Sequence, residues 1–205
     1  MRRLRSFCEE QKPGFVLIGE VLFGDYNLIV NDEMLHSCTN YECYKGIYSS
    51  LNSMNLFEIA HSLNRQYGPE QWCIYRGKHL MSFVDNHDVD RLASKLRVKE
   101  HLPLVYTLLY FLPGIPSVYY GSEWGISGRK EGGNDDPLRP ALKLEEMEAS
   151  SPNPELCEWI RGLGKIRQEH PESIFGAYRE LLLTNRQYAF ARIQEEQALV
   201  VAVNN

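Results

Sequence analysis

Residues 81–91, with the sequence Met-Ser-Phe-Val-Asp-Asn-His-Asp-Val-Asp-Arg, decide how the rest of the chain is interpreted. The apolar run 81–84 has the length of a buried strand, and it ends in the polar cluster Asn86-His87-Asp88. Polar groups are costly to bury unpaired, so such a cluster at a strand end needs partners or a task. In α/β barrels the carboxyl ends of the strands form the mouth where ligands bind. The structural alternative is that Asp88 or Asp90 caps the next helix.

Two further segments match a known pattern together with this one. Residues 15–21 form an apolar run that ends in Gly-Glu-Val, and residues 114–123 read Gly-Ile-Pro-Ser-Val-Tyr-Tyr-Gly-Ser-Glu. Residues 83–88 resemble the last short signature motif of the α-amylase family of glycoside hydrolases, and residues 15–21 resemble the signature before it. Residues 114–123 are similar to the last barrel strand of that family. The three segments occur in the family's order, and the resemblance covers nearly the whole chain.

Composition indicates a globular protein and narrows the function classes. The 205 residues are 43% apolar and 24% charged, which is enough to form a core. A net charge of −5 without a basic run gives no sign of nucleic-acid binding. No apolar stretch approaches the roughly 20 residues that span a bilayer, and the first ten residues lack the apolar segment of a secretion signal. Five cysteines without paired spacing predict reduced thiols, a cytoplasmic location and no metal centre.

Helices and strands are expected to alternate along most of the chain. In chain order we expect a helix over 2–11, a strand over 14–18 leading to Glu20, a loop-like stretch over 22–48 with a weak strand at 35–39, a helix over 52–67, the strand 81–84, a long helix ending at Leu112 and a strand over 115–120. Residues 121–144 are rich in Gly, Asp and Arg and predict a long loop.

The C-terminal part changes character. Asn153-Pro154-Glu155 is a good helix start, and the helix is expected to bury a stripe of apolar side chains: Leu156, Trp159, Ile160, Leu163 and Ile166. Residues 188–193 and 198–203 alternate or run apolar on either side of a polar turn, which predicts a β-hairpin.

Set against the family, this order implies an α/β fold: strands 5 to 8 of a (β/α)8 barrel, followed by the start of a β-sandwich domain. The expected domains are the C-terminal half of the catalytic barrel at 1–172 and the first strands of the β-domain at 173–205. A complete barrel takes about 250 residues, so 205 residues are too few for a barrel and a further domain.

The resemblance implies roles for six residues. Glu20 matches the general acid/base, Asp88 matches the third family carboxylate, which holds substrate hydroxyls, and His87 matches a sugar-binding histidine. Asn86 and Arg91 either bind substrate or orient their neighbours. Arg139 lies in a loop similar to one in the branch that degrades cyclic and short maltodextrins, and is otherwise a solvated surface arginine. For Glu20 and His87 the alternatives are a structural ion pair and a satisfied core histidine. No metal ligand cluster and no cofactor is expected.

The departure from the family concerns its nucleophile, an aspartate at the end of the fourth barrel strand. No strand precedes the first helix of this chain, so that aspartate has no counterpart. We therefore expect the polypeptide alone not to turn over substrate. We also expect a complementary N-terminal half-barrel or self-association to cover the free edges of the half-barrel.

The function that follows is a fragment of a retaining glycosidase acting on α-1,4 bonds, with α-1,6 bonds as a further option, in maltodextrins or cyclodextrins. A transglycosylase of the same family uses the same carboxylates. The alternative from another class is a non-catalytic carbohydrate-binding protein or subunit remnant. An unrelated α/β hydrolase is disfavoured because no Gly-x-Ser-x-Gly motif occurs.

Overall fold

The computed structural model describes residues 1–205. Four short parallel strands form its first sheet: β1 (Ile18–Gly19), β2 (Ser37–Cys38), β3 (Met81–Phe83) and β4 (Ile115–Ser117). β1 pairs with β2, β3 pairs with β4, and a parallel bridge between Thr39 and Met81 joins the two pairs. The order in space therefore equals the order in the chain, as in a barrel wall, and all four carboxyl ends lie at one edge.

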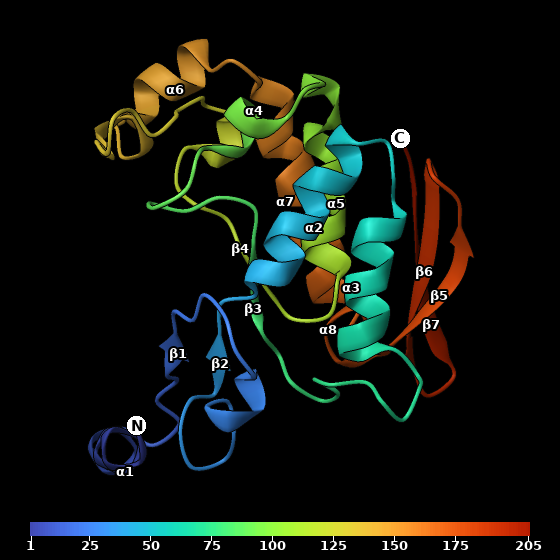
Figure 1. Cartoon of the computed structure of the whole chain (residues 1–205). Coiled ribbons are helices and arrows are strands. Elements are labelled where there is room, and N and C mark those ends of the chain that lie inside the picture. Colours follow the sequence, from blue (N-terminus) through green and yellow to red (C-terminus); the bar gives the residue numbers. More distant parts are fainter.

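Most of the helices lie on one side of these strands, and α1 (Arg2–Gln11) lies apart from them beside β1 and β2 (Figure 1). The bounds of the other helices are α2 (Tyr41–Asn52), α3 (Phe57–Tyr67), α4 (Leu92–Lys95), α5 (Leu102–Phe111), α6 (Leu144–Ser150), α7 (Pro154–Glu169) and α8 (Glu172–Phe175), with the single 3₁₀ turns η1 (Tyr26–Leu28), η2 (Lys99–His101), η3 (Ser122–Trp124) and η4 (Asp136–Leu138). α2 packs on α3, and α5 packs on α7. Ile47, Leu63 and Leu109 at these contacts are almost completely buried in one continuous hydrophobic core.

A second sheet closes the other end of the molecule. β5 (Ala177–Leu183), β6 (Gln187–Gln194) and β7 (Gln197–Asn204) form an antiparallel meander in that order. The predicted hairpin corresponds to β6 and β7, and Gln194 faces Gln197 across its two-residue turn. Tyr188, Phe190 and Val201 point into the same core as the helices, so the sheet is packed against them (Figure 1).

Several expected elements have different bounds in the structure. The stretch 22–48 is loop-like up to Asn40, and the weak strand expected at 35–39 is β2. From Tyr41 it is helical, because α2 begins there and the Asn40 side chain accepts the N–H of Cys43 at 3.1 Å. The buried face of α2 includes Gly46 and Ser50, which weaken its apolar periodicity. The expected helix over 52–67 is the end of α2 and then α3, separated where Met54 adopts φ 53°.

The expected long helix up to Leu112 is also wrong. It is divided into α4, η2 and α5, because the Asn52 side chain bonds the Lys95 carbonyl and the Arg97 N–H and holds the chain extended there. α6 and β5 were not expected. In α7, the predicted stripe is buried at Leu156, Ile160 and Leu163, whereas Trp159 is 48% and Ile166 39% exposed.

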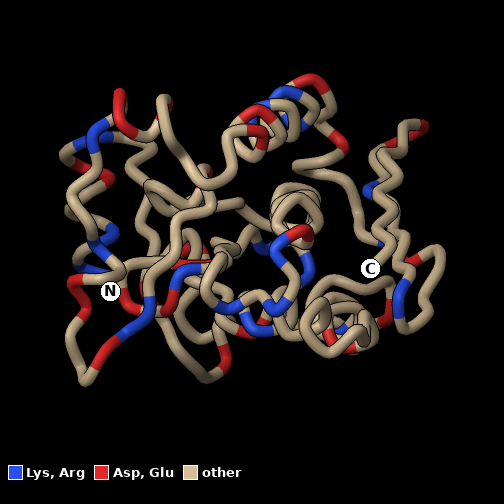
Figure 2. Tube along the Cα trace, turned by 90° about the horizontal axis from the view of Figure 1, so that it is seen from above, with Lys and Arg blue, Asp and Glu red and all other residues tan.

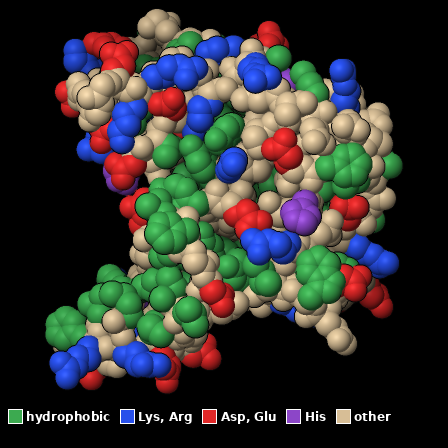
Figure 3. Space-filling model, viewed as in Figure 1, with side chains coloured by type: hydrophobic (Ala, Val, Ile, Leu, Met, Phe, Trp, Pro, Cys, Tyr) green, Lys and Arg blue, Asp and Glu red, His purple; other side chains and the backbone are tan.

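The N-terminal margin of the molecule is open. β1 has a partner on one side only, and no residue of α1 is buried. Phe7 is 58% exposed, Ile18 44% and Phe23 84%. α1 projects from the body beside β1 and β2 (Figure 1), and apolar side chains gather over this part of the surface (Figure 3). We call α1 and β1, with the connections that flank β1, the N-terminal margin.

Charge is distributed rather than concentrated. Acidic and basic residues are interspersed along the chain trace (Figure 2). None of the helices is both long enough and apolar enough to span a bilayer.

Candidate active site

Three of the predicted site residues meet at the carboxyl ends of the parallel strands. Glu20 directly follows β1, and His87 and Asp88 follow β3 after a short turn. One ligand-type atom of each of these three side chains lies within 4.8 Å of the others. His87 Nε2 is 3.4 Å from Asp88 Oδ2, and both side chains are about half exposed. The sheet therefore brings together residues that are 67 or 68 positions apart in the sequence, on a surface open to solvent.

Tyr41 holds Glu20 and was not predicted as a site residue. It is the first residue of α2, immediately after the end of β2, and its hydroxyl donates to Glu20 Oε1 at 2.9 Å. Its ring packs edge-on against Phe83 at 4.9 Å between centroids. Burial raises the pKa of Tyr41, so the phenol stays protonated and remains a donor at neutral pH. The signal in the sequence was its place next to Asn40, at the end of a weakly predicted strand.

Asn86 shapes the turn that carries His87 and Asp88. Its Oδ1 accepts the backbone N–H groups of Asp88 at 2.8 Å and Val89 at 3.1 Å. An asparagine side chain used in this way fixes the turn conformation. The contacts support the orienting role of Asn86.

Arg139 reaches the site from the long loop after β4. Its Nη2 is 2.8 Å from Asp88 Oδ1 and 3.0 Å from Asp135 Oδ2, and its Nε donates to the His87 carbonyl at 3.0 Å. The guanidinium therefore holds the Asp88 carboxylate from one side and leaves the side near His87 open. Arg139 is exposed, as a surface arginine would be, but its contacts are specific to the site.

Arg91 does not face the site. Its side chain is completely buried, and its nitrogens donate to protein oxygens of Tyr120, Ser122 and Leu138. In this position it cannot contact a substrate at the mouth, which corrects the substrate-binding role and supports the orienting one. Sequence reasoning could not find this, because two of its three partners are backbone carbonyls far along the chain.

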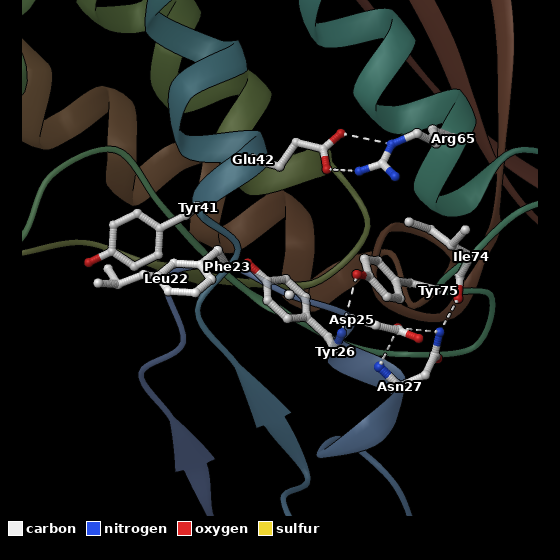
Figure 4. A pocket seen from close by; sticks show the side chains of 11 residues that line it. Leu22, Phe23, Asp25, Tyr26, Asn27, Tyr41, Glu42, Arg65, Ile74 and Tyr75 are labelled. Atoms are coloured by element: carbon white, nitrogen blue, oxygen red, sulfur yellow. Dashed lines mark hydrogen bonds and ion pairs between the residues drawn. The ribbon is translucent and has the colours of Figure 1, made fainter.

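A cavity of about 540 Å³ adjoins the site on the side of Tyr41 (Figure 4). Tyr26 and Tyr75 stack in its wall at 5.3 Å, and Leu22 and Phe23 border it. Its polar lining is already paired internally: Glu42 forms an ion pair with Arg65, and Asn27 bonds Asp25 and the Ile74 carbonyl. The cavity has the volume of a small-ligand pocket but offers few free polar groups.

Glu20, His87 and Asp88 are also the one set of three metal-ligand-type side chains that lie this close together. An imidazole and two carboxylates suit a transition-metal dication. Arg139 places a positive charge on Asp88, however, and that charge opposes a dication at the same carboxylate. The arrangement fits hydrogen bonding and proton transfer to a neutral polar ligand better than metal binding.

Comparisons with known proteins give one consistent result. The family profile described as "Alpha amylase, catalytic domain" matches residues 1–165. A cyclomaltodextrinase from Thermoanaerobacter pseudethanolicus is 25% identical over 219 aligned residues, which cover all of this chain and 34% of that protein. A beta/alpha-amylase from Paenibacillus polymyxa is 27% identical over 96% of this chain and 16% of that protein. The chain thus spans about a third of the length of the cyclomaltodextrinase.

Solved structures show the same fold. A cyclic α-maltosyl-(1→6)-maltose hydrolase from Arthrobacter globiformis, in complex with its cyclic saccharide, superposes with a TM-score of 0.82 at 22% identity, covering 99% of this chain and 44% of that one. An α-amylase from H. orenii superposes with a TM-score of 0.80 at 20% identity, covering 99% and 46%.

Proposed function

The chain belongs to the α-amylase catalytic-domain family, and on this premise we propose that it supplies the acid/base side of a retaining glycosidase active site. The proposed substrates are short α-1,4-linked maltodextrins or cyclodextrins, with α-1,6 bonds as a second option. Cyclomaltodextrinases are among its relatives. Hydrolysis and glycosyl transfer would use the same carboxylates and differ in whether water or a sugar takes the glycosyl group.

The observation that carries the proposal is the meeting of Glu20, His87 and Asp88 within 4.8 Å at the mouth of the sheet. In the proposed reaction the Glu20 carboxyl protonates the leaving glycosidic oxygen and then takes a proton from the incoming water or sugar. Tyr41 holds one oxygen of Glu20 and leaves the other for the substrate. The Asp88 carboxylate accepts hydrogen bonds from sugar hydroxyls, and the His87 ring donates one to a sugar hydroxyl. Arg139 keeps Asp88 in place.

A retaining mechanism also needs a nucleophilic carboxylate about 5 Å from the acid. Asp88 lies close enough to Glu20, but Arg139 already binds it, and we assign it to the substrate. We propose that the nucleophile comes from a complementary N-terminal half-barrel, whose last strand would pair with the free edge of β1. The four strands of this chain would then be strands five to eight of a closed barrel.

The position of α1 favours a complementary half over a second copy of this chain. In a (β/α)8 barrel the outer helices cover the strands, and α1 precedes β1 with Leu4 and Phe7 exposed. α1 is thus suited to cover a strand placed before β1. In a dimer of two such half-barrels that strand would be the partner copy's β4, which is followed by its own helix α7. Two helices would compete for one place.

We also propose that the chain contains two domains, the half-barrel at 1–172 and the start of a β-domain at 173–205. The boundary falls between the long helix α7 and the first strand of the meander, within the one-turn helix α8. The shared core means that the β-domain would stabilise the half-barrel rather than move independently.

The test is hydrolysis of maltotriose and β-cyclodextrin by the purified chain, its Glu20→Gln variant and a control variant. Glu196→Gln is the control, because Glu196 is an exposed carboxylate in the β6–β7 turn, remote from the site. We expect no turnover by the chain alone, and turnover after recombination with the first four strands of a cyclomaltodextrinase barrel, lost with Glu20→Gln and kept with Glu196→Gln.

Two other results would change the assignment. Turnover by the chain alone that disappears in Glu20→Gln would mean that Asp88 or another carboxylate here is the nucleophile. Saccharide binding by calorimetry, with no turnover even after recombination, would favour the non-catalytic binding function. If no combination of the polypeptides shows either saccharide binding or turnover, the proposal is contradicted.

A further inference from the structure

Arg91 is a buried arginine, and each of its three guanidinium nitrogens donates to one loop. Its Nε and Nη2 donate to the Leu138 carbonyl at 3.1 and 2.7 Å, and its Nη1 donates to the Tyr120 carbonyl at 2.6 Å and to Ser122 Oγ at 3.0 Å. Its guanidinium carbon lies 4.2 Å from the centre of the Tyr119 ring. Arg91 therefore holds both ends of the loop that runs from 119 to 139.

The far end of that loop is the part that reaches the site. Leu138, whose carbonyl receives two bonds from Arg91, immediately precedes Arg139. Arg139 in turn bonds the Asp88 carboxylate and the His87 carbonyl. A shift of the 138 carbonyl would therefore move the Arg139 backbone and draw its guanidinium away from Asp88.

The near end is anchored to the strand that carries the site. Ser122 Oγ lies 2.8 and 2.9 Å from the two carboxylate oxygens of the buried Asp85, which also accepts the N–H of Leu92 at 2.8 Å. Asp85 lies two residues after β3 and three before Asp88. Arg91, Ser122 and Asp85 thus link the strand end to the loop in a region closed to solvent, where hydrogen bonds are strong.

The middle of the loop fits closely against Arg91. The Arg91 N–H donates to the Gly128 carbonyl at 2.9 Å, and the Gly128 N–H donates to Ser94 Oγ at 2.8 Å. A Cβ at position 128 would lie 2.3 Å from the Pro137 carbonyl oxygen and 3.1 Å from Arg91 Cγ. Residue 128 can fit between the Pro137 carbonyl and Arg91 only because it has no side chain, and the closest contact would be with the Pro137 carbonyl.

We propose that Arg91 is a positioning residue that fixes the 119–139 loop so that Arg139 stays on Asp88 and His87. The inference rests on the glucan-binding role of Asp88 and His87 proposed above. The guanidinium is needed because its planar fork serves two carbonyls and a hydroxyl at once, whereas the single ammonium of a lysine serves fewer acceptors in a different geometry.

The experiment compares Arg91→Lys, Gly128→Ala and Arg139→Gln with Arg192→Lys in the full chain. Arg192 is the matched control because it is equally buried and also donates to backbone carbonyls, those of Phe111, Ser173, Ile174 and Gly176, at the opposite end of the molecule. The readouts are amide exchange at residues 91 and 128, maltotriose affinity by calorimetry, and global unfolding in urea. Gly128→Ala displaces the loop while leaving Arg91 intact, so the test does not depend on one variant folding.

We expect Arg91→Lys and Gly128→Ala to speed amide exchange of the loop about tenfold or more, and Arg192→Lys to leave it unchanged. We expect Arg91→Lys and Arg139→Gln each to weaken maltotriose binding about tenfold. The double variant Arg91→Lys with Arg139→Gln should be no weaker than the weaker single variant, because both changes remove the same contact with Asp88.

The positioning role is overturned if the affinity losses of Arg91→Lys and Arg139→Gln add up in the double variant. It is also overturned if Arg192→Lys weakens maltotriose binding as much as Arg91→Lys does. In both cases Arg91 would serve stability alone. Unchanged loop exchange in Arg91→Lys and Gly128→Ala would overturn it independently of any ligand. A wild-type chain that binds no maltotriose, alone or after recombination, would count against the proposed function, and the exchange readout would still decide the role of Arg91.

Discussion

The C-terminal sheet and the N-terminal margin lie at opposite ends of one chain and are attached in opposite ways. Five hydrogen bonds from Arg192 to backbone carbonyls tie β6 to α8 and to the end of α5, and the Tyr178 and Tyr188 hydroxyls bond each other in the core. α1, in contrast, contacts the connection between β1 and β2 chiefly through an exposed bond from Arg2 to Glu33 and a part-buried bond from Arg5 to the Met34 carbonyl.

This difference shows which surfaces of the fold are complete. The sheet pairs the buried Arg192 guanidinium and the Tyr178 and Tyr188 hydroxyls within the chain, and it contributes large apolar side chains to the core. The margin has apolar side chains of similar size, but they lie in solvent next to an unpaired strand edge. An unpaired strand edge beside exposed apolar side chains is typical of a surface that binds another polypeptide segment.

The largest effect should separate two phenylalanines. Phe190 in β6 is completely buried, and Phe7 in α1 is 58% exposed. Phe190→Ala should lower the free energy of unfolding by about 3–5 kcal/mol, because it removes buried apolar area and leaves a cavity. Phe7→Ala should change it by less than about 0.5 kcal/mol. Urea denaturation of both variants measures this, and similar losses would mean that the margin is packed in solution.

A pH titration should show a smaller effect at Cys38, where the margin joins the core. Burial raises the pKa of the Cys38 thiol from 9.0 to about 11. Between these values the unfolded chain loses the thiol proton and the folded chain keeps it, so stability falls as the pH rises. From pH 8 to 10 the wild type should lose about 1 kcal/mol more than Cys38→Ala in urea denaturation. Parallel curves would mean that solvent reaches Cys38.

The smallest effect concerns the ion pair of α1. Arg2 and Glu33 are 71% and 64% exposed, so Arg2→Gln should change the free energy of unfolding by less than about 0.5 kcal/mol. Arg65→Gln, which removes the more buried pair with Glu42, is the comparison and should cost more. Thermal unfolding monitored by circular dichroism checks both. A loss above about 1 kcal/mol for Arg2→Gln would show that α1 is integral to the folded unit.

Sequence predicted those elements whose signal is local. The helix at 2–11, the strand before Asp85 and the β6–β7 hairpin were expected and are present. α2 was missed because its burial involves Gly46 and Ser50, and the break after α4 because distant Asn52 holds it. These features depend on tertiary contacts that no short window contains.

In the site, too, some residues could be predicted from a local motif and others depend on tertiary contacts. Glu20, His87 and Asp88 were named from motifs, and the parallel strands bring them together. The supporting contacts were not found: Tyr41 on Glu20 and Arg91 beneath the loop depend on which strand ends and carbonyls become neighbours in space. Motifs therefore indicated the groups at the surface of the site, and only the fold showed what holds them.

Glu20 follows a strand of two residues at the outer edge of the sheet. Edge strands with few backbone bonds are the first parts of a protein to open when it fluctuates, so the residence time of Glu20 beside Asp88 is limited by the lifetime of this edge. Thr39 lengthens that lifetime, because its Oγ1 accepts the N–H of Val21 at 2.9 Å, just beyond Glu20. We therefore expect local opening of the backbone at β1, and not the stability of the core, to set the fraction of time for which the two carboxyl groups lie close together.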